Sequence, residues 1–125
     1  MDISPRLEPG SPVIAAYGGG GFRIGGARHE GSLVVTAERV VAWPPSRFSP
    51  AAEESLLAIL DQQTGIEVLL IGCGTGAARL SRPFAAALSR RGIAGDPMDT
   101  GAACRTFNIL LQEGRRAAAA LIAVR

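Results

Sequence analysis

A short glycine-rich loop holds the residues of this chain with the clearest potential for chemistry. It follows an apolar run at residues 67–71 and consists of Gly72, Cys73, Gly74, Thr75 and Gly76. Glycines after a buried strand let a ligand approach the backbone closely, while the next helix offers free amide donors. One hypothesis is therefore a shallow ligand or anion pocket at this edge of the sheet. The simpler interpretation, which we favour, is a tight turn between a strand and a helix.

The sequence around this loop does not fit the cofactor-binding folds that the loop suggests. The loop looks much like the first motif of methyltransferases that use S-adenosylmethionine, and it also fits the looser dinucleotide pattern. Too few residues follow Gly76 for the remaining strands of such a sheet, and a β-rich third of the chain precedes the loop. A lone glycine fingerprint is a weak signal. We therefore predict no cofactor.

A second polar group follows the next short apolar segment. Asp99 and Thr100 carry side-chain oxygens that can cap a helix, and Arg105 lies farther along the same helix. If this helix packs near the glycine loop, Asp99, Arg105 and Thr75 would form a polar cluster at the sheet edge. We favour a structural pairing of Arg105 with the Asp99 carboxylate, and a ligand site is the alternative. The candidate pocket comprises Gly72, Cys73, Gly74, Thr75, Gly76, Asp99, Thr100 and Arg105.

The thiols and the imidazole are too few for the usual cysteine and histidine chemistry. Cys73, Cys104 and His29 make neither a disulfide framework nor a four-ligand zinc site. Cys104 falls in the first turns of a helix, where the dipole would lower the pKa of its thiol. No base is evident beside it, and the common catalytic motifs are missing. We therefore predict no metal and favour a non-catalytic protein, with an enzyme as the open alternative.

The single tryptophan, Trp43, closes an apolar segment just before two prolines. Tryptophan in such a place serves either as a buried anchor or as an interface residue, because it is enriched at binding hot spots. Both interpretations stay open, and Trp43 is the candidate interface residue.

Composition limits the remaining possibilities. The chain has 125 residues, of which 47% are hydrophobic and 19% charged, which is typical of one globular core. Its net charge of +2 is too small to indicate nucleic-acid binding. The N-terminal residues lack a targeting pattern, and the longest apolar run, residues 117–124, is too short to span a bilayer. We expect a cytoplasmic protein without a transmembrane segment.

The order of predicted elements indicates an α/β fold. Residues 1–21, rich in proline and glycine, are expected to form an extended N-terminal arm, and residues 22–125 a single domain. Three short strands in the first third favour an antiparallel meander, and crossover helices then join the strands of a mixed sheet, with the first of these strands at its centre. The predicted strands are residues 22–24, 31–36, 40–43, 67–71, 93–95 and 117–124, and the predicted helices begin at Ser49, Ser81 and Asp99 or Thr100 and end near residues 62, 92 and 114.

Several separated motifs resemble one known domain family. The strongest is the run from Met98 to Arg115 followed by the alanine-rich segment at residues 117–122. The other matching pieces are Tyr17 with Phe22 and Ile24, the Gly31-Ser32 strand ending in Trp43-Pro44, and the glycine loop with Pro83 beyond it. Together they resemble a family found in bacteria, archaea and mitochondria, whose mitochondrial member is an assembly factor for respiratory complex I.

This resemblance implies a three-layer β+β/α fold, with a mixed sheet and a smaller β-layer. It implies no reaction, because the bacterial members have no settled activity. We therefore expect an interaction or assembly module that binds a protein partner, at or near the inner membrane. The alternative is a small-molecule or anion-binding protein, or an enzyme, that uses the glycine loop with Asp99 and Arg105. A homodimer through a sheet edge or helix face also stays open.

Overall fold

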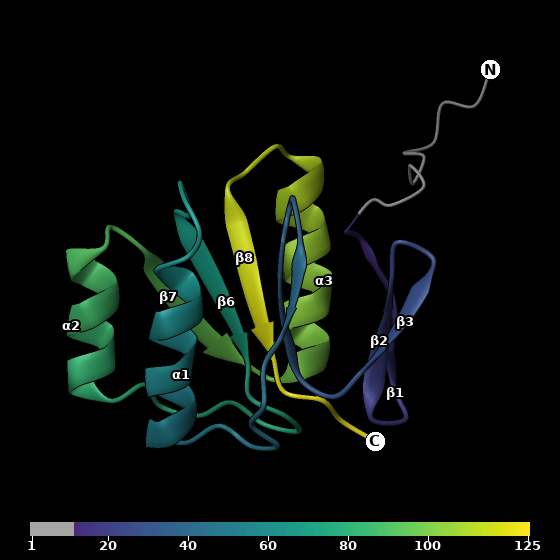
Figure 1. The fold of residues 1–125 in the computed structure, drawn as a ribbon, viewed down its shortest axis with the longest axis horizontal. Helices are drawn as coiled ribbons and strands as arrows, with labels where there is room; N and C mark the ends of the chain where they lie inside the picture. The colour runs from purple at the N-terminus through teal and green to yellow at the C-terminus, as the bar shows by residue number, and fades with distance from the viewer. Residues whose placement is uncertain (1–11) are drawn as a thin grey trace.

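The structure is a computed structural model that describes residues 12–125. Within this range, eight strands form two sheets, and three helices pack with them (Figure 1). The smaller sheet has the order β1-β2-β3, and the larger one has the order β5-β4-β8-β6-β7. This mixed α/β architecture confirms the predicted fold class.

The smaller sheet is an antiparallel meander of two tight hairpins. Its strands are β1 (Ile14–Gly18), β2 (Gly21–Ile24) and β3 (Ala27–Glu30). Each hairpin turns on a Gly-Gly pair, residues 19–20 and 25–26, and all four glycines have positive φ. Two-residue hairpin turns of type I′ require this conformation at both positions, which glycine adopts without strain. The sequence placed residues 14–18 in an extended arm, but they form β1. Residues 1–11 of that arm lie outside the described residues.

The predicted meander of the first third is wrong in its pairing. Residues 22–24 belong to the smaller sheet, whereas β4 (Leu33–Thr36) and β5 (Val40–Ala42) pair with each other in the larger sheet. The cause is long-range pairing, because β4 also pairs antiparallel with β8 (Ala117–Leu121), from the end of the chain. Short strands adjacent in sequence therefore separate into two layers.

The parallel part of the larger sheet contains β6 (Val68–Gly72), β7 (Ala94–Met98) and β8. Strand β6 pairs in parallel with both β7 and β8. In the five-stranded order, β8 lies at the centre, so the central strand is β8 and not the predicted segment at residues 67–71. All five residues of β8 are buried, since its alanines fit between layers on both faces.

All three helices begin where the sequence predicts. They are α1 (Pro50–Leu60), α2 (Arg82–Arg90) and α3 (Thr100–Gln112). In each, the side chain of the N-cap residue accepts a hydrogen bond from a backbone N–H three residues on, which satisfies one free donor of the first turn. These caps are Ser49, Ser81 and Asp99.

The core has two halves, one on each face of the larger sheet. Alternate residues of β6 divide between them: Leu69 and Ile71 pack with α1 and α2, whereas Leu70 packs with α3 and the smaller sheet. This follows from the two-residue period of a strand, which turns neighbouring side chains to opposite faces. The helices α1 and α2 thus cover one face, and α3 with the smaller sheet covers the other (Figure 1). This arrangement gives the predicted three layers.

Candidate functional site

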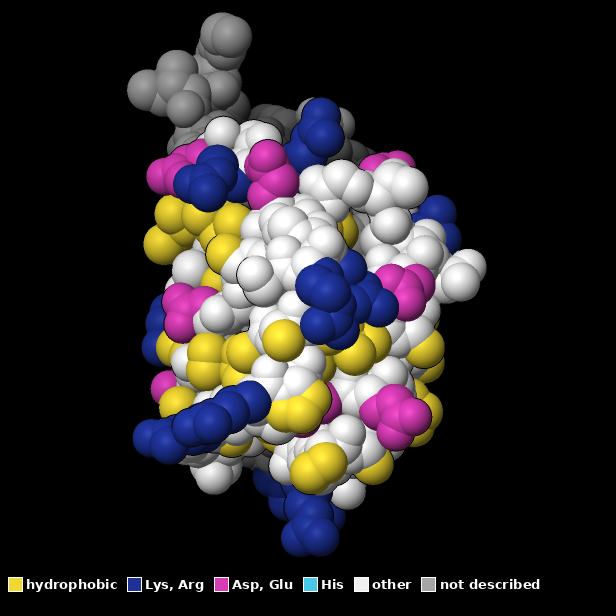
Figure 2. Space-filling view, turned by 90° about the vertical axis from the view of Figure 1, so that its left-hand side faces the viewer, with side chains coloured by type: hydrophobic (Ala, Val, Ile, Leu, Met, Phe, Trp, Pro, Cys, Tyr) yellow, Lys and Arg dark blue, Asp and Glu magenta, His cyan; other side chains and the backbone are white. Residues whose placement is uncertain are grey.

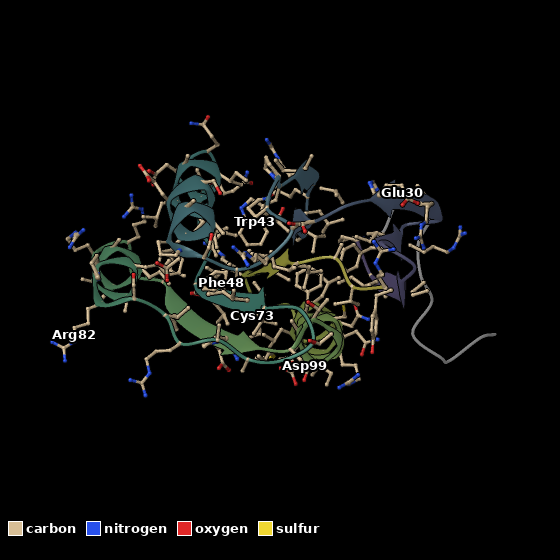
Figure 3. All side chains as sticks on the ribbon, turned by 90° about the horizontal axis from the view of Figure 1, so that it is seen from below. Glu30, Trp43, Phe48, Cys73, Arg82 and Asp99 are labelled. Carbon is tan, nitrogen blue, oxygen red and sulfur yellow. The ribbon has the colours of Figure 1, made fainter. Side chains whose placement is uncertain are left out.

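The glycine loop lies at the carboxyl end of β6, between β8 and the start of α3. The amide of Cys73 donates to the carbonyl of Met98 at 2.8 Å, and the carbonyl of Gly72 accepts from the amide of Ile122 at 2.9 Å. Figure 3 views this edge of the sheet and labels Cys73 and Asp99 on the adjoining segments. The structure therefore brings the loop and the start of α3 together, as the sequence suggests.

Thr100 occupies the place where a ligand would meet this loop. Its Oγ1 accepts a hydrogen bond from the amide of Gly74 at 3.0 Å and donates one to the carbonyl of Ile122 at 2.7 Å. Its own amide donates to the carbonyl of Gly74 at 2.9 Å, and its side chain is fully buried. The loop amide that faces α3 is thus already satisfied within the protein.

The first glycine of the loop is required by packing. A Cβ atom at Gly72 would lie 2.9 Å from Cα of Thr100 and 3.1 Å from Cδ2 of Leu121. Gly74 has a φ of +97°, which other residues rarely adopt. Gly76, in contrast, has open space where its Cβ would be, and Thr75 and Gly76 are exposed. Only part of the motif is therefore constrained, and that part is constrained by α3 and β8.

Asp99 and Arg105 point to separate partners. The Asp99 carboxylate accepts from the amide of Ala102 at 2.8 Å, which caps α3. Nη1 of Arg105 lies 3.4 Å from the hydroxyl of Tyr17 on β1. Among residues 12–125, no ion pair joins Arg105 to Asp99 and no hydrogen bond joins either to Thr75. The polar cluster expected from the sequence is not assembled in this structure.

The two thiols lie in environments that keep them protonated. Burial raises the pKa of the Cys104 thiol to about 12, although the charge of Arg105 opposes part of this shift. Burial also raises the pKa of Cys73, which is partly buried. The Cys104 pKa is therefore raised, not lowered as the position of this residue near the helix start suggested, because burial disfavours the charged thiolate. Neither thiol is an activated nucleophile at neutral pH.

Trp43 is a buried anchor between β5 and α1. Its side chain is 1% exposed, and its indole N–H donates to Oγ of Ser55 at 2.9 Å. That hydroxyl in turn donates to the carbonyl of Ala52 at 2.9 Å. Direct contact of this indole with a partner would require it to leave the core.

Glu53 is a buried polar residue whose contact with Ser81 is not evident from the sequence. It is 6% exposed, and its carboxylate accepts from the amide of Ser81 at 2.9 Å and from its hydroxyl at 2.7 Å. Ser81 as a helix cap was evident from the sequence. Its partner was not, because the contact depends on how α1 packs against α2.

A small exposed surface beside Arg105 combines aromatic, aliphatic and cationic groups. Tyr17 and Ile109 are large hydrophobic residues with exposed fractions of 43% and 55%. Tyr17 packs over Gly101, where any side chain would collide with its ring. We call Tyr17, Arg105 and Ile109 the α3 surface.

The face formed by α1 and α2 has a different character. Figure 2 shows arginine side chains there interspersed with acidic and apolar ones. Arg91, the C-cap residue of α2, pairs with Asp61, the C-cap residue of α1, at 2.8 Å, and this hydrogen bond lowers the pKa of the Asp61 carboxyl.

Residues 12–125 contain no group of three or more His, Cys, Asp or Glu side chains that could hold a metal ion. None of the helices in this range is long and apolar enough to cross a membrane.

Comparison with known proteins identifies relatives along almost the whole chain. An uncharacterised protein of Rhodobacter capsulatus is 39% identical over 123 residues, which cover 96% of this chain and 93% of that protein. A bovine protein named NADH dehydrogenase [ubiquinone] 1 alpha subcomplex assembly factor 3 is 35% identical over 122 residues. That match covers 98% of this chain but 66% of the bovine protein, so the chain spans about two thirds of its length.

A solved structure and a family model also match this chain over most of its length. The solution structure of a Bordetella pertussis protein, described as a Mth938-like domain, superposes with a TM-score of 0.79 at 25% identity. The superposition covers 98% of this chain and 92% of that one. Residues 14–122 match the model described as "Protein of unknown function (DUF498/DUF598)". The chain therefore belongs to the DUF498/DUF598 family, as the motifs of its sequence suggested.

Proposed function

We propose that this chain is a non-catalytic interaction module that helps to assemble a respiratory complex. The observation that carries the proposal is the similarity to the bovine assembly factor, which extends over 98% of this chain. The geometry of the glycine loop supports a non-catalytic role, because Thr100 satisfies its inward amide and the thiols are protonated. The proposed partner is a protein of a membrane-associated assembly, reached from the cytoplasmic side of the inner membrane.

The α3 surface is the proposed contact with that partner. Arg105 and Ile109 lie one helical turn apart on α3, so their side chains share a face. The Tyr17 hydroxyl contacts one N–H group of Arg105, and a guanidinium has five donors. Tyrosine and arginine carry much of the energy in protein interfaces. The matching partner surface would place a carboxylate, which arginine binds in bidentate fashion, beside an apolar side chain.

A pull-down with surface variants tests both parts of the proposal. Wild type, Ile109→Asp, Arg105→Ala and Ala86→Asp would be immobilised and exposed to solubilised membranes of the organism that encodes the protein. Ala86 is exposed on α2, away from the α3 surface, and serves as the matched control. We expect subunits of the respiratory complex, identified by mass spectrometry, to bind wild type and Ala86→Asp. Their recovery should fall at least about tenfold with the two α3 variants.

Two results would count against this function. Recovery of no respiratory subunit above background with wild type would contradict the assembly role. Equal recovery with all four proteins would place the contact elsewhere on the molecule. Circular dichroism melting of each variant would verify that the substitutions leave the fold intact. Sedimentation of wild type in the same buffer would decide whether the module acts as a monomer or a homodimer.

A further inference from the structure

The edge of the larger sheet opposite the glycine loop contains a cavity of about 460 Å³. It lies among the β4–β5 turn, the loop from α1 to β6 and the segment that leads into β8, at the upper edge of the sheet in Figure 1. These segments meet because β4 is antiparallel to β8 whereas β6 is parallel to it. The end of β4 and the beginnings of β6 and β8 therefore share one edge. Cavities of this size accommodate small organic ligands.

The charge of this cavity is positive. Arg39 contributes from the β4–β5 turn and Arg116 from the segment before β8, while Glu38 is the one acidic residue among those that line it. Among residues 12–125, the ion pairs of arginine involve Arg28 and Arg91, so neither cavity arginine is neutralised by a described carboxylate. Two arginines from distant parts of the sequence thus line the same cavity, and no carboxylate of residues 12–125 forms an ion pair with either of them.

The backbone on both sides of the cavity is fixed by hydrogen bonds. Oγ1 of the buried Thr36 accepts from the amides of Glu38 and Arg39, each at 3.2 Å. On the other side, the carbonyl of Arg116 accepts from the amide of Glu67 at 2.8 Å. Both arginines therefore extend from segments of defined conformation, which reduces the entropy lost when a ligand binds.

Gly65 makes room for the guanidinium of Arg116. Its φ is +74°, and a Cβ there would lie 3.0 Å from Nη1 of Arg116. The side chain of Arg116 therefore lies against bare backbone in the loop after α1. Gln62 and Gln63, from the same loop, add side-chain amides that can donate hydrogen bonds.

We infer that this cavity binds a small organic anion, held through its carboxylate or phosphate group by Arg39 and Arg116. Arginine binds both kinds of group with parallel hydrogen bonds, and the glutamine amides supply the neutral donors that orient the remainder of such a ligand. This site does not depend on the proposed assembly role, because it lies at the opposite edge of the sheet from the glycine loop and does not include the α3 surface.

Nuclear magnetic resonance titration of the full chain tests the inference. The probes are citrate for carboxylates, adenosine monophosphate for organic phosphates, and inorganic phosphate alone. We expect at least one organic probe to cause saturable shifts in the backbone amides of residues 62–66, 38–39 and 116. Citrate alone would identify a carboxylate site, and adenosine monophosphate alone a phosphate site.

Charge variants provide the control. Arg39→Gln and Arg116→Gln should each weaken the binding of the active probe at least about tenfold, since each removes a charge-assisted contact. Arg82→Gln removes an exposed arginine at the start of α2, at the periphery in Figure 3, and should leave the affinity unchanged. The inference is overturned if no organic probe gives saturable shifts at these amides. It is also overturned if all three variants bind the probe as wild type does.

Discussion

Glu53 and Ser81 join the two helices on one face of the sheet through a pair of hydrogen bonds. The carboxylate accepts from the backbone N–H of Ser81 at 2.9 Å and from its hydroxyl at 2.7 Å. Because Ser81 is the N-cap of α2, this negative charge lies at the positive end of that helix dipole. A buried acid of α1 thus stabilises the start of α2.

Removal of the Glu53 carboxylate should destabilise the protein. Glu53→Ala leaves the amide of Ser81 without its acceptor in a partly buried place, which we expect to cost about 2–3 kcal/mol. Urea denaturation monitored by circular dichroism would measure this loss. Glu54→Ala, at the exposed neighbouring position, should change the free energy of unfolding very little. Equal effects of the two substitutions would mean that the contact with Ser81 does not stabilise the fold.

The hydroxyl of Thr100 should be essential to the glycine loop. Thr100→Val preserves the shape of the side chain but leaves the amide of Gly74 and the carbonyl of Ile122 unsatisfied, at an expected cost of about 2–3 kcal/mol. Thr100→Ser keeps the hydroxyl and loses one methyl, which should cost about 1 kcal/mol. Hydrogen exchange at the Gly74 amide would locate the effect. Slow exchange in Thr100→Val would contradict the hydrogen bond.

The glycines of the loop should differ sharply in their tolerance of alanine. Gly72→Ala places a methyl group against the backbone of α3, and overpacking of this kind should cost about 1–3 kcal/mol. Gly76→Ala meets open space, so its effect on the free energy of unfolding should be near zero. Thermal denaturation of the two variants would compare them directly. A strong effect at Gly76 would indicate a constraint that the packing does not supply.

Cys104 should make the folded state less stable at alkaline pH. Its pKa rises from an ordinary value of 9.0 to about 12 on folding, so between these values the folded protein binds more protons than the unfolded chain. The contribution of this thiol to stability is therefore complete below pH 9 and is lost as the pH rises towards 12. For one proton, the slope of the unfolding free energy reaches about 1.4 kcal/mol per pH unit.

The Cys104→Ala variant provides the comparison for this pH dependence of the unfolding free energy. Cys104→Ala removes the titrating group, and other alkaline groups contribute to both proteins alike. The unfolding free energy of wild type, relative to that of Cys104→Ala, should therefore decrease as the pH rises above 9. A constant difference across this range would show that the Cys104 pKa is not raised.

Local signals in the sequence predicted the helices well. Ser49 and Ser81 each stand directly before a helix with proline near its start, which fixes the first turn independently of the rest of the fold. Gly92 ends the second helical segment with a φ of +70°, as its position suggested. These features depend on a few neighbouring residues, so they can be inferred without knowledge of tertiary contacts.

Long-range pairing explains where the strand predictions failed. Nothing local in residues 33–36 shows that this strand pairs with Ala117–Leu121, from the other end of the chain. The strand after the Gly-Gly turn at residues 25–26 is polar and largely exposed, and it lacks the alternation of apolar and polar residues typical of a strand. Because β3 is not evident from the sequence, residues 22–24 and 33–36 look like neighbouring strands although they belong to different sheets.

The candidate site shows the same division. The sequence correctly placed the glycine loop after a buried strand and Asp99 at a helix start. It did not show that the Thr100 hydroxyl would satisfy the loop amide, because that requires β8 and α3 in register. The cavity with Arg39 and Arg116 was also beyond local analysis, since three separate segments enclose it.

The alanines of β8 act as spacers whose length sets the distance between the layers. Ala120 borders the half of the core under α1 and α2, whereas Ala119 borders the half under α3 and the smaller sheet. A larger side chain at either position would push apart a different pair of layers. Enlargement of Ala119 in particular would lift α3, and with it Arg105 and Ile109, relative to the sheet. The position of the α3 surface is thus adjustable from the middle of the protein, by a residue that is fully buried.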